Sequence, residues 1–293
     1  MATIEAGVIL WPTPEEARQE ALEVIKRAGV DCVELWMGDQ CLNPRDYNGI
    51  IRLAEQLHTM GIQPFSVHAP WGDQLEPSSP HPEHRAAWLA VSTAAAAILR
   101  VVGGRVVVVH PSPPLEEAER PARLRQCIES TARLAERCAE VGAVVAVENM
   151  LPAHLGDRAE ELLAIMDPLP REHAGFCFDT GHAHVCPEGM AVGEAMGDRI
   201  VTLHLHDNQG QSDEHLLPFA GSVDWQRVAQ VLNAAHYAGP YIIESGKPSR
   251  EEVAQKTKEL AGRLHALRNG NDHQSAPVQA PLSCGVRFRP NKP

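Results

Sequence analysis

The sequence lacks a C-x-x-C pair, and its seven cysteines are scattered along 293 residues. An odd, dispersed set of cysteines argues against a disulfide scaffold and favours a reduced, cytosolic protein. At the N-terminus no basic segment precedes a long apolar run, so we expect no secretory signal. The most apolar stretch, about residues 86–102, is shorter than the roughly 20 residues that a membrane span needs, and it contains Arg100. We therefore predict an alanine-rich buried helix there and no membrane partner.

Positive charge is also scarce. The formal net charge is −12, from 26 Lys and Arg against 38 Asp and Glu. This balance disfavours an electrostatic nucleic-acid binder, although a local basic strip can occur on an acidic protein. A nucleic-acid partner is therefore not expected.

Alternating strand and helix signals run almost from end to end. Short apolar or β-branched runs predict eight strands, over Ala6–Leu10, Cys32–Trp36, Pro64–His68, Arg105–His110, Val144–Glu148, Gly175–Asp179, Ile200–His206 and Tyr241–Glu244. A helix is predicted after each strand, including a long one from about Leu115 to Val141 and a weak one near Glu188–Met196. Eight such units imply a parallel sheet, which closes most naturally as an α/β fold of the (β/α)8 TIM barrel type.

An open doubly wound sheet also uses strand–helix repeats. That fold carries a glycine-rich fingerprint after its first strand, and no such fingerprint occurs here. We therefore predict a single TIM-barrel domain over residues 1–268. Residues 269–293 are polar and Pro-rich without periodicity, and we expect them to form a disordered tail.

Metal-ligating side chains stand at the ends of six consecutive predicted strands. They are His68, His110, Glu148, Asp179, His204 with His206, and Glu244. In a parallel barrel the carboxyl ends of the strands meet at one mouth, where active sites are built. A single His or Asp after a strand is more often a cap or a satisfied polar residue than a ligand. Six in succession would repel one another or stay unsatisfied unless a divalent cation held them, so the pattern predicts a metal site.

The seventh predicted strand carries two imidazoles. Thr202, His204 and His206 share one of its faces, and a polar loop with Asp213 and His215 follows at once. A soluble protein seldom places two imidazoles in an apolar strand unless something polar faces them. This strand is therefore expected to face a polar site.

Six short motifs carry a resemblance to a known family. They are Ser66-Val67-His68-Ala69-Pro70, Val147-Glu148-Asn149, Phe178-Asp179-Thr180-Gly181-His182, His204-Leu205-His206-Asp207-Asn208, Asp213-Glu214-His215 and Ile243-Glu244-Ser245. Over about residues 6–267 the chain resembles the xylose-isomerase-like TIM barrels. That superfamily holds sugar isomerases and epimerases together with DNA-repair enzymes of the endonuclease IV type.

The epimerase branch of this superfamily implies one metal ion held by Glu148, Asp179, His204 and Glu244. In that branch the two glutamates also form the acid/base pair on opposite sides of the substrate carbon. A carboxylate bound to a divalent ion can move a proton while the ion polarises the adjacent carbonyl. The mixed oxygen and nitrogen ligands suit Mn, Mg, Co or Zn without singling one out.

The endonuclease branch implies up to three zinc ions. All nine of its ligand types occur here in order, at His68, His110, Glu148, Asp179, His182, His204, Asp213, His215 and Glu244. This set would suit in-line hydrolysis of a phosphodiester. The segments around it depart from that branch, because Ala69-Pro70-Trp71-Gly72 stands in place of its DNA-contacting loop. His182 and His206 are alternatively expected to touch a substrate oxygen.

The isomerase branch is also matched with exceptions. Gly210 stands where ketose epimerases often carry an Arg, and Phe219-Ala220-Gly221 replaces their common Gly-Glu-Gly. The identity of the sugar is therefore not transferable from the resemblance.

The sequence thus predicts a cytosolic, divalent-metal-dependent isomerase or epimerase that acts on a small-molecule sugar or sugar phosphate. The alternatives are a multi-zinc phosphodiesterase or abasic-site endonuclease, and a non-enzymatic, metal-dependent sugar-binding protein. Trp11, Trp36 and Trp71 fall at or just past the first three strands and are predicted either to stack on a sugar or to pack in the core. A helix face between barrels is a candidate contact for a homo-oligomer.

Overall fold

The computed structural model describes residues 5–11, 13–38, 42–72, 74–246 and 249–270. The predicted tail, residues 269–293, lies outside this range except for its first two residues, so the disorder expected there stays a prediction.

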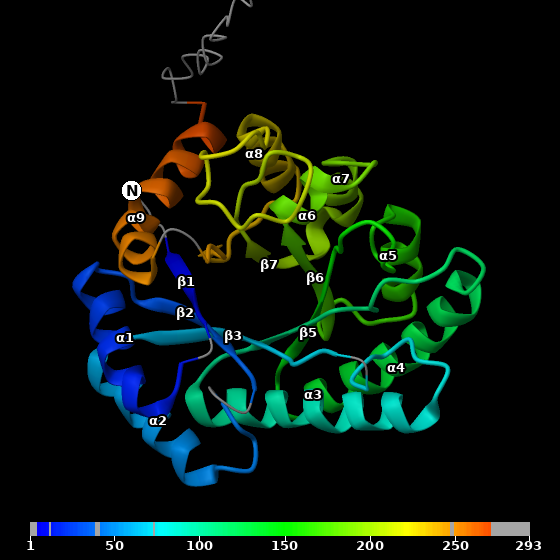
Figure 1. Ribbon diagram of the computed structural model, residues 1–293, viewed down its shortest axis with the longest axis horizontal. Helices are drawn as coiled ribbons and strands as arrows, with labels where there is room; N and C mark the ends of the chain where they lie inside the picture. Colours follow the sequence, from blue (N-terminus) through cyan, green and yellow to red (C-terminus); the bar gives the residue numbers. More distant parts are fainter. Residues whose placement is uncertain (1–4, 12, 39–41, 73, 247–248, 271–293) are drawn as a thin grey trace, which may run out of the picture.

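Eight parallel strands form the barrel predicted from the sequence (Figure 1). They are β1 (Ala6–Leu10), β2 (Cys32–Trp36), β3 (Gln63–His68), β4 (Val106–Val109), β5 (Val144–Glu148), β6 (Ala174–Asp179), β7 (Ile200–His204) and β8 (Tyr241–Ile243). Neighbours pair in the order β7-β6-β5-β4-β3-β2-β1-β8. The ring closes through Leu205, which bridges Ile243 in parallel just after β7. The TIM-barrel prediction is confirmed.

Helices surround the strands on the outside (Figure 1). They are α1 (Glu15–Arg27), α2 (Tyr47–Met60), α3 (Pro82–Val102), α4 (Arg120–Glu140), α5 (Ala159–Met166), α6 (Thr180–Val185), α7 (Ala191–Met196), α8 (Trp225–Ala234) and α9 (Arg250–Arg268). The long helix predicted from Leu115 begins later, at Arg120, and α6 was not predicted. Helix α6 starts directly after β6 because the Asp179 carboxylate caps it, accepting the His182 amide at 2.7 Å.

Helix α3 is the alanine-rich helix expected from the sequence. By length and composition alone it would pass for a membrane span. In the barrel, however, it packs against β3 and β4 and lies between α2 and α4. Trp88, Ala95 and Leu99 are buried on its inner face. The segment therefore contributes one face to the core of the barrel.

The barrel interior is apolar at its base. Side chains of β1, β2 and β8 form one cluster there, namely Ile9, Cys32 and Ile242. A second cluster contains Val106, Val108, Ala146 and Cys177. Because side chains two residues apart share a face, the inward residues after Val108, Ala146, Cys177 and Ile242 are the predicted His110, Glu148, Asp179 and Glu244. The polar site therefore lies above these apolar clusters.

The pairing of β2 with β3 contains a register shift. It steps from Val33–Pro64 to Glu34–Ser66, so that β3 contributes one extra residue, Phe65. Such a bulge changes which residues face one another above it. Beyond the shift Trp36 pairs with His68, which places both rings at the mouth.

The described cysteines are unpaired, in line with the expectation from their spacing. Cys32, Cys127, Cys138, Cys177 and Cys186 are all free and buried.

Candidate metal centre

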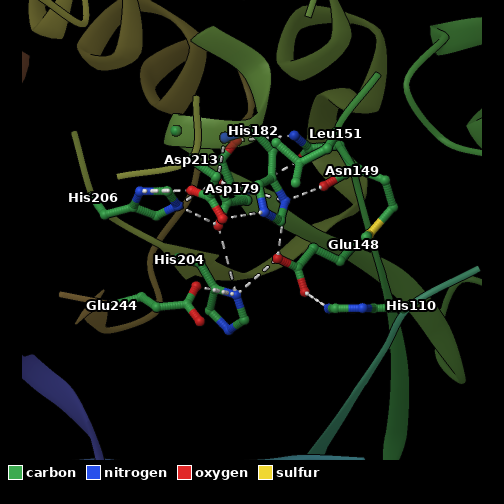
Figure 2. A network of polar contacts seen from close by, with 12 residues as sticks. His110, Glu148, Asn149, Leu151, Asp179, His182, His204, His206, Asp213 and Glu244 are labelled. Atoms are coloured by element: carbon green, nitrogen blue, oxygen red, sulfur yellow. Dashed lines mark hydrogen bonds and ion pairs between the residues drawn. The ribbon is translucent and has the colours of Figure 1, made fainter. Parts of the chain in front are cut away.

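All ten predicted site residues meet at the carboxyl ends of the strands. His68, Glu148, Asp179 and His204 are the last residues of β3, β5, β6 and β7, and His110 and Glu244 directly follow β4 and β8. His182 lies on α6, and His206, Asp213 and His215 lie between β7 and α8. Figure 2 shows these side chains converging from different strands onto one network. Their roles as ligands or catalysts stay predictions.

Four of these residues form the centre of the network. One ligand atom from each of Glu148, Asp179, His204 and Glu244 lies within 4.8 Å of the others, and all four side chains are buried. His204 Nδ1 is 2.8 Å from Glu244 Oε2, 3.1 Å from Glu148 Oε1 and 3.9 Å from Asp179 Oδ2. Three carboxylates and one imidazole therefore surround a single small volume.

A second group adjoins the centre through Glu148. His68 Nε2 and His110 Nε2 lie 3.4 Å and 3.3 Å from Glu148 Oε2. The other carboxylate oxygen, Oε1, faces His182 at 3.4 Å and His204 at 3.1 Å. Glu148 is therefore shared between two neighbouring sets of candidate ligands.

A third group lies on the β7–α8 side of the network. Asp213 Oδ2 is 2.9 Å from His215 Nε2 and 3.6 Å from His182 Nε2. His206 Nε2 is 3.0 Å from Asp179 and so links this group to the centre. His215 has a φ of 49°, and its Nδ1 donates to the Glu244 carbonyl at 3.0 Å. This bond to β8 supports an uncommon backbone conformation for a residue other than glycine.

Some buried polar atoms at the site make no hydrogen bond of good geometry. They are Glu244 Oε2, Asp213 Oδ1 and His206 Nδ1, although Glu244 Oε2 lies 2.8 Å from His204 Nδ1. Burying a polar group without a hydrogen bond lowers the stability of the fold by about 2–7 kcal/mol, and burying an unpaired charge lowers it further. A cation coordinated by these oxygens and nitrogens would satisfy them. The donor set, mostly carboxylate with imidazole, suits a divalent ion.

The charges of the site depend on one another. Burial opposes ionisation of Glu148, but the imidazoles of His204 and His110 hold the pKa of its carboxyl well below the usual range. Burial lowers the pKa of His204, while the Cys177 sulfur and the Glu244 carboxylate raise it well above the usual value. Without a cation, protons on the imidazoles therefore balance the carboxylates.

Glu34 belongs to the same network and was missed in the sequence. It lies in the middle of β2, is fully buried, and its Oε1 is 2.9 Å from His204 Nε2. Burial raises the pKa of its carboxyl, but His204 outweighs this effect and lowers it. The available signal was an acidic residue inside the short apolar run Cys32–Trp36, in phase with the inward positions.

A cavity of about 450 Å³ opens above the network. Its wall includes Glu148, Glu244 and the three tryptophans Trp11, Trp36 and Trp71. The Trp36 ring stacks on His68 with a centroid distance of 4.8 Å and meets Trp71 at 4.7 Å. Trp71 is 45% exposed, so its indole covers the entrance and does not pack in the core.

Sequence relatives match larger or smaller parts of the chain. An uncharacterized protein of Sinorhizobium fredii is 30% identical over 135 residues, which is 44% of this chain and 43% of that protein. An uncharacterized protein of Methanocaldococcus jannaschii is 28% identical over 84% of both chains. A D-psicose 3-epimerase of Enterocloster bolteae is 27% identical over 42% of this chain and 39% of that enzyme.

Solved structures share the fold. A D-tagatose 3-epimerase-like protein superposes with a TM-score of 0.77 at 24% identity, covering 90% of this chain and 98% of that one. An L-ribulose 3-epimerase gives 0.77 at 17% identity, with coverages of 95% and 100%. An IOLI protein with a bound zinc atom gives 0.75 at 15%, with coverages of 92% and 99%.

The family comparison agrees with these folds. The model of the xylose isomerase-like TIM barrels matches residues 22–266. This chain belongs to the family of xylose isomerase-like TIM barrels.

Proposed function

We propose that this protein is a divalent-metal-dependent isomerase or epimerase of a sugar or sugar phosphate. The observation that carries the proposal is the buried quartet Glu148, Asp179, His204 and Glu244, whose ligand atoms lie within 4.8 Å of one another beneath an open cavity. The likeness of the fold to sugar 3-epimerases supports the proposal, as does the partial match to a D-psicose 3-epimerase.

In this proposal Glu148 and Glu244 act on opposite faces of one substrate carbon. Figure 2 shows Glu148 and Glu244 on opposite sides of His204, and both line the cavity. A carboxylate on each side of a substrate carbon can remove a proton from one face and return one to the other. A bound divalent ion would supply polarisation of the adjacent carbonyl, which makes the carbon acid stronger. Asp179 and His204 would complete the set that holds it.

The remaining side chains of the wall orient the substrate. His182 and His215 line the cavity beside Asp213 and can bond sugar hydroxyls. Trp36 and Trp71 present aromatic surface to an apolar sugar face and reduce the water at the mouth. A desolvated site strengthens the electrostatic interactions that stabilise an enediolate.

The experiment is solvent deuterium exchange into a panel of ketoses and ketose phosphates with Mn²⁺ present. We expect exchange of one carbon-bound proton with at least one member of the panel. Glu148→Gln and Glu244→Gln should each lower the exchange rate by about 10²–10⁴-fold, the usual contribution of a general acid or base. Absence of exchange with every sugar would refute the acid/base assignment.

The flanking groups favour a second candidate, a multi-zinc phosphodiesterase of the endonuclease IV type. His68, Glu148 and His204 form one further group of ligand atoms within 4.8 Å, and His206, Asp213 and His215 form another. Elemental analysis of the purified protein separates the two candidates. One ion per chain supports the isomerase, whereas three ions with nicking of abasic DNA support the hydrolase.

A third candidate is a metal-dependent sugar-binding protein without catalysis. It would bind a sugar in calorimetry and give no proton exchange with it.

A further inference from the structure

Glu34 is a carboxylate enclosed in the barrel below the mouth. It is fully buried, and its register neighbours are Ile9 on β1 and Ser66 on β3. Among the residues that the structure describes, it belongs to none of the groups whose ligand atoms lie within 4.8 Å of one another. It also does not line the cavity. Glu34 is therefore out of reach of both a substrate and the candidate metal position.

Both oxygens of this carboxylate accept hydrogen bonds. Ser66 Oγ donates to Oε2 at 2.5 Å, and His204 Nε2 lies 2.9 Å from Oε1. A buried carboxylate without donors would be costly, and these two bonds account for its presence in an apolar strand. The hydrogen bond from Ser66 also fixes which oxygen faces the imidazole.

The two ring nitrogens of His204 therefore face different partners. Its Nε2 faces Glu34, while its Nδ1 lies within 4 Å of Glu148, Asp179 and Glu244. An imidazole can offer a lone pair to a cation from Nδ1 only when its proton is on Nε2. A carboxylate acceptor at Nε2 holds that tautomer, fixes the plane of the ring and raises the basicity of the other nitrogen.

We propose that Glu34 is the positioning residue that orients His204, through the Nε2 hydrogen bond, for binding of a divalent cation at Nδ1. This inference rests on the metal site of the proposed function and adds a residue that acts through His204. A substitution at Glu34 should change cation affinity and the coordination spectrum while leaving the barrel folded.

The partners of Glu34 allow a sharp substitution test. In Glu34→Gln the amide oxygen can still accept from His204 Nε2, because the Ser66 hydroxyl can turn and accept from the amide NH2. Glu34→Leu removes both acceptor oxygens and leaves His204 Nε2 without one. The glutamine variant should therefore keep part of what the leucine variant loses.

The measurement is titration of the chelator-treated full chain with Co²⁺, followed by its visible absorption. We expect Glu34→Leu to weaken Co²⁺ binding by about 10–100-fold, the usual effect of losing such an outer partner, and to alter the absorption bands. Ser66→Ala alone should bind Co²⁺ within a few-fold of wild type. Glu34→Gln, which keeps an acceptor but not the negative charge, should fall between Ser66→Ala and Glu34→Leu. Circular dichroism checks that each variant is folded.

The outcomes separate the positioning role from the metal site. Wild-type affinity and spectrum in a folded Glu34→Leu would overturn the positioning role and leave the metal site standing. If Glu34→Leu does not fold, Glu34→Gln decides, and Co²⁺ affinity and spectrum equal to those of Ser66→Ala would overturn the role. If the wild-type chain binds no Co²⁺, the proposed metal site itself fails.

Discussion

Binding of a divalent ion to the four candidate ligands should raise the melting temperature of this protein. Glu148, Asp179, His204 and Glu244 are buried and converge only in the folded chain, so the ion binds the native state. At a free concentration of about 1,000 times Kd such a ligand adds about 4.1 kcal/mol to the free energy of unfolding. For a domain of this size, about 2 °C per kcal/mol applies, which gives a rise in Tm of about 8 °C.

The assay is differential scanning calorimetry of the chelator-treated chain with and without Mn²⁺, Mg²⁺, Co²⁺ or Zn²⁺. Glu244→Gln removes one of the four candidate ligands and should weaken binding by at least about 100-fold, since even outer partners cost 10–100-fold. At the same metal concentration only about 1.4 kcal/mol of stabilisation would remain, or about 3 °C.

A matched control comes from the same cavity. Glu76 lines it as a carboxylate but pairs with Arg123 at 2.6 Å, away from the four ligands. Glu76→Gln should therefore show the full rise in Tm relative to its own metal-free form. The reasoning is refuted if none of the four ions raises the wild-type Tm, or if Glu244→Gln keeps the whole effect.

Three further predictions concern protons, the cavity wall and the scaffold. Burial lowers the pKa of His204, but surrounding negative groups raise it well above the usual value, so its imidazole carries an extra proton at pH 7 in the metal-free chain. Binding of a cation at Nδ1 should release that proton, and the affinity for the cation should therefore fall as the pH falls. A calorimetric binding enthalpy that does not change with the ionisation enthalpy of the buffer would contradict this prediction. Trp71→Ala should raise KM about 2–10-fold, because it removes about 0.5–1.5 kcal/mol of stacking between the indole and the substrate. Steady-state kinetics should show kcat little changed. An unchanged KM would exclude stacking of the substrate on Trp71. Arg120 is buried between the carboxylates of Glu161, at 2.7 Å, and Asp157, at 3.0 Å. Because Arg120→Met leaves both carboxylates without this partner, it should cost about 3–5 kcal/mol of unfolding free energy in urea titrations. A loss under about 1 kcal/mol would show that these ion pairs contribute little to stability.

The strand-end ligands could be predicted because their geometry follows from a simple periodic rule. In a parallel barrel, the residue at the carboxyl end of each strand reaches the same mouth wherever it lies in the sequence. His68, Glu148 and Asp179 needed no knowledge of their partners to be placed there. The barrel itself followed from the alternation of strand and helix signals.

Other features could not be read from the sequence, for reasons that differ from one feature to the next. The role proposed for Glu34 follows from its contact with His204, which is 170 residues away in the sequence. Helix α6 was missed because a side chain that is itself a candidate ligand, Asp179, also caps it. The Trp71 indole could not be assigned to core or mouth until its exposure was known. The proposed localisation, the contact for a homo-oligomer and the disorder of the tail stay predictions.

The additional residue in β3 has a consequence for how this barrel can change. Phe65 is the unpaired residue, so its deletion would leave Pro64 opposite Val33 and Ser66 opposite Glu34 in a regular register. Deleting Val67 would instead bring His68 opposite Leu35 and turn it towards the helices, since neighbouring strand positions point to opposite sides. The length of β3 can therefore change by one residue at Phe65, whereas the spacing between Ser66 and His68 is fixed. Sequence drift is expected to spare that spacing even where the outward residues of β3 vary.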